Sequence, residues 1–149
     1  MEKRCAMFAC VFCFVPVTVL VGQDSEAVMQ LEARVSGFFD NLRDKQIGPD
    51  KAFAELLAGG PLEKSDKVKM LIERSNKLEE LYGTFVKAER IAAKEVGKDL
   101  VLLTYLHKAK NYPVVWYFTY YRPPSIVGDE QEWMVIAVRF DTRLDRLGL

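Results

Sequence analysis

The hydrophobic period of the sequence changes near Gly83, and this change limits the chain to a small set of folds. Before Gly83, apolar residues recur every three or four positions, which is the spacing of amphipathic helices. After it, β-branched and aromatic residues dominate, and turn residues occur at hairpin spacing. Helices followed by adjacent strands predict an α+β domain, in which the helices cover one face of an antiparallel sheet.

Three helices are predicted in the first half. Residues 23–25 offer a helix cap, and the apolar stripe that follows runs to about Gln46, where residues 47–49 (IGP) end it. A shorter helix is predicted over residues 50–58, and a third begins near Ser65 or Asp66. The side chains predicted to face the core are Val28, Leu31, Val35, Phe38, Phe39 and Leu42 in the first helix, Ala52, Phe53, Leu56 and Leu57 in the second, and Val68, Leu71, Ile72, Ser75 and Leu78 in the third.

Four long antiparallel strands are predicted in the second half, over residues 84–96, 100–109, 114–122 and 132–142. Strands of this length give a strongly twisted and bent sheet. The predicted fold class is therefore α+β, with three helices packed on one face of a strongly bent four-stranded sheet. Alternation assigns to that inner face Leu100, Leu102, Thr104 and Leu106, then Val114, Trp116, Phe118 and Tyr120, then Met134, Ile136, Val138 and Phe140.

The opposite face of the predicted sheet is also apolar, whereas a sheet covered on one side is expected to be polar on the other. A large exposed apolar patch is unusual on a soluble monomer, and Tyr and Trp are enriched in interfaces. The pattern therefore predicts a homodimer joined through this face; the alternative is that the bend folds the patch under the chain end, residues 141–149. The predicted interface residues are Leu103, Tyr105, Val115, Tyr117, Trp133 and Val135.

The first 22 residues resemble a secretory signal peptide. Lys3 and Arg4 precede an uncharged apolar run over residues 5–22, and Pro16 near its end favours a cleaved leader over a permanent anchor. Small residues allow a cut after Gly22 or after Ala27. The expectation is a leader over residues 1–22, a single domain over residues 23–149, and a secreted or periplasmic location, with an N-terminal membrane anchor as the alternative.

Composition excludes several classes of chemistry. Basic and acidic residues number 21 each, and they are interspersed, which argues against a nucleic-acid-binding surface. All three cysteines lie in the leader and the chain has a single histidine, so the mature domain lacks the usual zinc ligands and cannot form a disulfide. The sequence contains no phosphate-binding glycine-rich loop and no dinucleotide fingerprint, so we expect no cofactor and no metal.

The chain resembles the nuclear-transport-factor-2-like superfamily, whose cone-shaped fold is also grouped as cystatin-like, over residues 25–147. The resemblance rests on the long first helix with its Phe38-Phe39 pair, on residues 56–62 (LLAGGPL), and on the closing strand, residues 132–140 (EWMVIAVRF). It implies a pocket between the bent sheet and the helices, and dimerisation through the sheet. Members include ketosteroid isomerases, polyketide cyclases, dehydratases and many non-catalytic domains, so the resemblance alone does not choose a function.

The predicted function is that of an exported, non-catalytic binding or accessory domain. The inward positions of the first helix and last strand carry no carboxylate that could serve as a general base. The expected ligand is a small apolar molecule or another protein, in a pocket lined by Phe38, Trp116, Tyr120 and Arg122.

The alternative is an isomerase- or cyclase-like enzyme that uses His107 or a pocket carboxylate. Alternation places His107 on the outer face, so no catalytic residue is assigned. If the face assignment is inverted, His107 becomes the best candidate base, with Tyr105 as its neighbour. A retained leader would instead indicate a membrane-tethered assembly domain.

Overall fold

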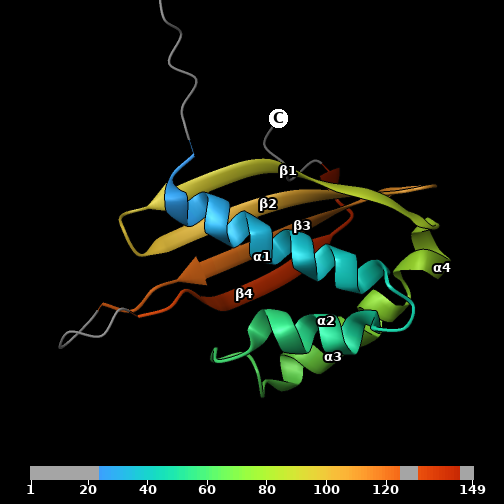
Figure 1. Ribbon diagram of the computed structural model, residues 1–149. Coiled ribbons are helices and arrows are strands. Elements are labelled where there is room, and N and C mark those ends of the chain that lie inside the picture. Colours follow the sequence, from blue (N-terminus) through green and yellow to red (C-terminus); the bar gives the residue numbers. More distant parts are fainter. Residues whose placement is uncertain (1–23, 125–130, 145–149) are drawn as a thin grey trace, which may run out of the picture.

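The computed structural model describes residues 24–124 and 131–144, and the predicted leader lies outside these residues (Figure 1). Helices precede an antiparallel sheet, which confirms the predicted α+β class, and each predicted strand boundary is within two residues of the observed one. The elements are α1 (Glu26–Arg43), α2 (Gly48–Leu57), α3 (Asp66–Asn76), α4 (Leu78–Tyr82), β1 (Phe85–Val96), β2 (Leu100–Ala109), β3 (Pro113–Tyr121) and β4 (Met134–Asp141).

The third predicted helix is divided into α3 and α4. At the division, the backbone N–H of Lys77 donates to the carbonyl of Arg74, three residues back, and this tighter turn interrupts the α-helical pattern. Ser75 also donates its hydroxyl to the carbonyl of Leu71, a local bond that bends helices. No helix in the described part of the chain is long and apolar enough to cross a membrane.

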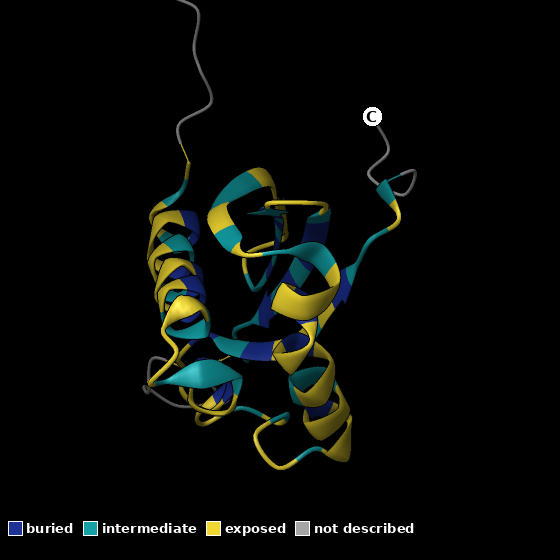
Figure 2. Cartoon of the chain, turned by 90° about the vertical axis from the view of Figure 1, so that its right-hand side faces the viewer, coloured by how far each residue is buried: buried dark blue, intermediate teal, exposed yellow. Residues whose placement is uncertain are grey.

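The sheet is an open meander in the order β1-β2-β3-β4, and the helices lie on one of its faces (Figure 1). β1 is an edge strand with two register shifts against β2, which leave Val86 and Ile91 unpaired and exposed. α1 runs along the inner face, with its buried side turned to the sheet and its exposed side to solvent (Figure 2).

The start of α1 is fixed to β1 by a polar network. Ser25 is the N-cap, and its hydroxyl accepts a hydrogen bond from the Val28 N–H at 3.2 Å. The Arg90 guanidinium donates to both carboxylate oxygens of Asp24, at 2.9 and 2.5 Å, and its Nε lies 3.5 Å from Glu32. This bidentate bond lowers the pKa of the Asp24 carboxyl.

The core between helices and sheet is filled with aromatic rings. The Phe38 ring packs edge-on against those of Phe39, Phe53, Trp116 and Phe118, with centroids 5.0–5.6 Å apart. All five side chains are buried. The predictions that Phe38, Phe39 and Trp116 are core residues are confirmed.

Alternation assigned the wrong face to β2 and to half of β4. The inward side chains of β2 are Val101, Leu103, Tyr105 and His107, and the predicted set, Leu100, Leu102, Thr104 and Leu106, is only partly buried. In β4 a register shift opposite Thr119 and Tyr120 changes which of the alternating side chains point inward. As a result Trp133 and Val135 point inward together with Phe140, while Ile136, predicted to be core, is 36% exposed.

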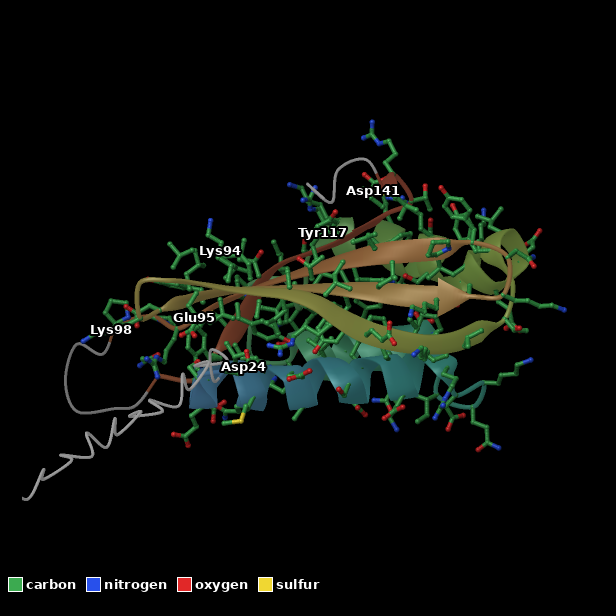
Figure 3. All side chains as sticks on the ribbon, turned by 90° about the horizontal axis from the view of Figure 1, so that it is seen from above. Asp24, Lys94, Glu95, Lys98, Tyr117 and Asp141 are labelled. Atoms are coloured by element: carbon green, nitrogen blue, oxygen red, sulfur yellow. The ribbon has the colours of Figure 1, made fainter. Side chains whose placement is uncertain are left out.

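The outer face of the sheet therefore differs from the prediction in β2 and in part of β4, and agrees with it in β3. Val115, Tyr117 and Thr119 of β3 lie there as expected, opposite Leu106, Thr104 and Leu102 of β2, because cross-strand partners share a face. Figure 3 shows Lys94, Tyr117 and Asp141 on the side of the sheet away from α1. The Arg139 guanidinium lies 4.2 Å from the centroid of the Tyr117 ring, as in a cation–π contact.

Replacing Phe38 or Trp116 with Ala is expected to lower the free energy of unfolding by about 3–5 kcal/mol, because each change leaves a cavity among packed rings. The matched variant is Ile136→Ala, which removes an exposed side chain and should cost less than about 1 kcal/mol. Urea titration followed by circular dichroism measures all three. Equal losses at the three positions would contradict this account of the core.

If the leader is removed, the structure predicts a cut after Gly22 rather than after Ala27. A cut after Ala27 would delete both Asp24, the partner of Arg90, and Ser25, the N-cap of α1. Intact-mass analysis of protein from a host that removes the leader should therefore find a chain that begins at Gln23. A folded product beginning at Val28 would show that α1 does not need this network.

Candidate functional site

His107 is a buried ionisable residue. It was predicted on the outer face of the sheet and lies on the inner face. It lies on the inner side of β2, 4% exposed, with its ring 4.8 Å from that of Phe85 and 6.2 Å from that of Phe39. Its Nδ1 is buried and has no hydrogen-bond partner among residues 24–124 and 131–144. Burial lowers the pKa of His107 to about 4, so the ring is neutral at pH 7.

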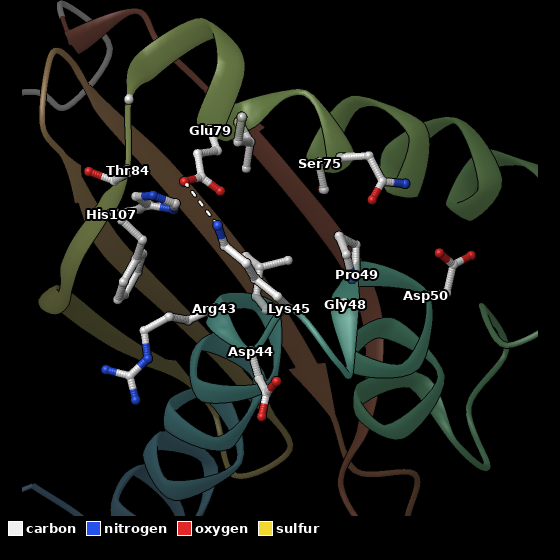
Figure 4. Close-up of a pocket in the computed structure, with 15 residues that line it drawn as sticks. Arg43, Asp44, Lys45, Gly48, Pro49, Asp50, Ser75, Glu79, Thr84 and His107 are labelled. Carbon is white, nitrogen blue, oxygen red and sulfur yellow. Dashed lines mark ion pairs between the residues drawn. The ribbon is translucent and has the colours of Figure 1, made fainter.

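His107 lines a pocket of about 640 Å³ between the C-terminal end of α1, the α3–α4 region and the start of β1 (Figure 4). Apolar side chains and His107 form its inner wall, and charged side chains stand at its rim. Glu79 and Lys45 reach toward each other across the pocket, with Nζ and Oε1 3.9 Å apart. The lining residues are Leu42, Arg43, Asp44, Lys45, Gly48, Pro49, Asp50, Ser75, Asn76, Leu78, Glu79, Gly83, Thr84, Phe85 and His107.

Two glycines with positive φ shape this pocket. Gly48, at φ 70°, turns the chain between α1 and α2, and Pro49 follows in the first turn of α2, where a missing N–H has no cost. Gly83, at φ 90°, ends α4, and a Cβ there would lie 3.1 Å from the side chains of Asn111 and Lys110. This close approach brings the start of β1 onto the β2–β3 turn, which places Phe85 beside His107.

The four residues predicted to line a ligand pocket do not form one site. Phe38, Trp116 and Tyr120 are enclosed in the core, and the prediction of an aromatic-lined cavity there is corrected to a filled interior. Arg122 lies with Trp133 in a separate hollow of about 760 Å³.

The cations of that second hollow already have protein partners. The Arg34 guanidinium donates to the carbonyls of Trp133, at 2.6 Å, and Leu56, at 3.4 Å. The Arg122 guanidinium donates to the carbonyl of Lys98 and lies 4.9 Å from the Trp133 ring centroid. These contacts assign the two arginines a structural role.

Most of the residues predicted for a dimer interface are inside the single chain. Leu103, Tyr105, Trp133 and Val135 belong to the hydrophobic core, and Val115 is buried as well. Val115 and Tyr117 lie on the outer face as predicted, where Val115 is buried and Tyr117 is partly exposed. The predicted interface is therefore corrected at those four core residues, and the homodimer itself stays a prediction.

Comparisons with protein-family models, with curated proteins and with solved structures find no match to this chain. Among the described residues there is no group of three or more His, Cys, Asp or Glu side chains placed to hold a metal ion. The candidate site is therefore assigned on geometry, burial and charge.

The stability of the protein is expected to fall as the pH drops from about 6.5, the ordinary pKa of histidine, to about 4. Over this range the unfolded chain binds a proton at His107 and the folded chain does not, so acid favours unfolding. The contribution is fully present above pH 6.5, and about 3 kcal/mol is lost by pH 4. Urea titrations at several pH values should show this loss for the natural chain and a smaller one for His107→Gln; parallel curves would contradict the neutral buried ring.

Proposed function

We propose that this chain is a binding domain for a small, uncharged and mostly apolar molecule, which occupies the pocket at His107. The observation that carries the proposal is a buried histidine with an unpartnered nitrogen in the wall of that pocket. A buried polar atom without a partner is unfavourable, so the imidazole gains a hydrogen bond if the ring turns Nδ1 toward a ligand in the pocket.

The charges around the pocket support an uncharged ligand. Arg43 and Lys45 at the rim face three carboxylates, those of Asp44, Asp50 and Glu79, so neither sign dominates. The histidine itself is neutral. Deeper in the pocket, the apolar side chains of Leu42, Pro49, Leu78 and Phe85 favour an apolar body on the ligand.

We further propose that the domain is exported and belongs to the nuclear-transport-factor-2-like superfamily. Support for export comes from the signal-like leader, residues 1–22. Support for the superfamily comes from the order of the elements, helices first and then a four-stranded antiparallel sheet covered on one face.

An isomerase- or cyclase-like enzyme is the second candidate, and the inward position of His107 favours it. Two features make binding the stronger proposal. In the described part of the chain no carboxylate holds the ring through Nδ1, as a catalytic histidine usually requires. A pKa of about 4 also makes His107 a weak base at neutral pH.

Phenol is expected to bind the pocket, because it combines an apolar ring with one hydrogen-bonding group. Titration of ¹⁵N-labelled protein should shift the amide signals of Ser75, Thr84 and Phe85, and His107→Gln should weaken binding by about five-fold, the effect of one hydrogen bond. Benzenesulfonate, the charged control, should bind more weakly. Unshifted amides around the pocket with phenol would refute the proposal.

We also propose that the domain forms a homodimer through the outer face of the sheet, centred on Tyr117, Leu102 and Leu106. Light scattering should give twice the monomer mass, and Tyr117→Glu should shift it toward the monomer by placing a charge in the contact. Met70→Glu is the matched control, since Met70 is an exposed apolar side chain on α3, on the helical side. A monomer at micromolar concentration would exclude the dimer.

A further inference from the structure

The hollow of about 760 Å³ that Arg122 lines is also lined by Arg34, and both arginines are anchored to Trp133. The hollow lies between the first half of α1, the β1–β2 turn and the ends of β3 and β4. The Arg34 guanidinium donates to the Trp133 carbonyl at 2.6 Å, and the Arg122 guanidinium lies 4.9 Å from the centroid of the Trp133 ring. Two positive charges from distant parts of the chain are therefore held beside one residue.

Arg34 is a partly buried cation whose partners in the described part of the chain are all neutral. Its guanidinium donates to the carbonyls of Trp133 and Leu56 and lies 5.5 Å from the centroid of the Tyr120 ring. No carboxylate in residues 24–124 and 131–144 forms an ion pair with it. Because a charge withdrawn from water is normally paired with an opposite charge, an anion that reaches Arg34 is stabilised there.

The contacts that fix these arginines leave hydrogen-bond donors free. Each terminal nitrogen of Arg34 gives one N–H to a carbonyl, which leaves the Nε–H and one N–H on each of those nitrogens. Arg34 is itself partly exposed and lines the hollow. Arg122 gives one N–H to the Lys98 carbonyl at 3.1 Å, and its side chain is 42% exposed. Since both guanidiniums are held in place before a ligand arrives, binding orders few further side chains.

We propose that this hollow binds a small, polar organic acid, whose carboxylate pairs with the Arg34 guanidinium and is also attracted by that of Arg122. Arginine suits a carboxylate because its planar group donates two parallel hydrogen bonds to the two oxygens. Gln30 and Gln131 line the same hollow, and their amides suit a hydroxyl or amide group on the rest of the ligand.

The organic-acid site is independent of the function proposed above. None of the described residues lines both this hollow and the pocket at His107. The two sites also differ in chemistry, because the pocket at His107 takes an uncharged molecule and this hollow takes an anion.

The charges around the hollow favour a ligand with a single negative charge. Asp99 lies 3.8 Å from the Arg122 Nε and partly offsets that cation, so Arg34 is left without a carboxylate partner among the described residues. Glu132 also lines the hollow; it is exposed, and in the same part of the chain it forms no ion pair with either arginine. Asp99 and Glu132 repel a doubly charged anion more than a singly charged one, so a carboxylate is expected to bind better than phosphate.

Acetate is the probe, titrated into ¹⁵N-labelled protein. Sodium chloride keeps the ionic strength constant, because salt screens exposed charges. Acetate should shift the Nε–H signal of Arg34 and the backbone amide signals of Gln30 and Trp133. The amide signals of Ser75 and Thr84, in the pocket at His107, should stay unshifted.

Arg122→Gln removes one cation of the hollow and should weaken acetate binding by about ten-fold, the effect of one hydrogen bond to a charged group. Arg74→Gln is the matched control. Arg74 is an exposed arginine that lies 4.7 Å from the centroid of the Phe140 ring, and it does not line this hollow. Arg74→Gln should leave acetate binding unchanged, and thermal unfolding verifies that each variant folds.

Inorganic phosphate, at the same pH and ionic strength, distinguishes between the two classes of anion. It should shift the signals of Arg34 and Gln30 less than acetate does, and tighter binding of phosphate would overturn the assignment to a carboxylate. Unshifted Arg34, Gln30 and Trp133 signals with acetate, or equal losses of binding in Arg122→Gln and Arg74→Gln, would overturn the site itself. The phenol titration at Ser75 and Thr84 decides the pocket at His107 separately.

Discussion

Phe38 lies where α1, α2 and the sheet meet, and its edge-on contacts with Phe53 of α2 and with Trp116 and Phe118 of β3 join the two layers. Such pairs are worth about 0.5–1.5 kcal/mol each beyond the burial of their area. These contacts hold α1 in place on the sheet. The C-terminal end of α1 and the turn at Gly48 then form one wall of the pocket at His107. The site therefore depends on a ring that does not line it.

The order of the elements was predictable because hydrophobic period is a local property, and the core positions of α1 and α2 follow from it directly. The faces of β2 were predictable in principle. The predicted loop between the second and third strands has four residues, 110–113, and an even loop pairs odd positions of one strand with even positions of the next. Because Trp116 faces inward, its partner Tyr105 must do so as well. Alternation within β2 alone cannot decide this, since both of its faces are apolar.

The change of face within β4 carries no comparable signal. Residues 133–138 are all apolar, and nothing in them marks the register shift that turns Val135 inward and Ile136 outward. The candidate site was missed for a related reason. It forms where the start of β1 approaches the β2–β3 turn, which the absence of a side chain at Gly83 permits. This is a contact between segments that are distant in sequence. Only the face of His107, derived from the hairpin loop, could have pointed to it.

The two register shifts in β1 have a consequence for the behaviour of the protein at high concentration. β1 is the long edge of an open sheet, with exposed Val86, Ile91 and Val96, and a straight apolar edge of this kind recruits further strands into aggregates. The unpaired residues at Val86 and Ile91 interrupt its backbone so that no long, regular row of free hydrogen-bonding groups is presented. Lys87 and Lys94 add charge beside these interruptions. Among the described residues, this edge is thus protected by its geometry.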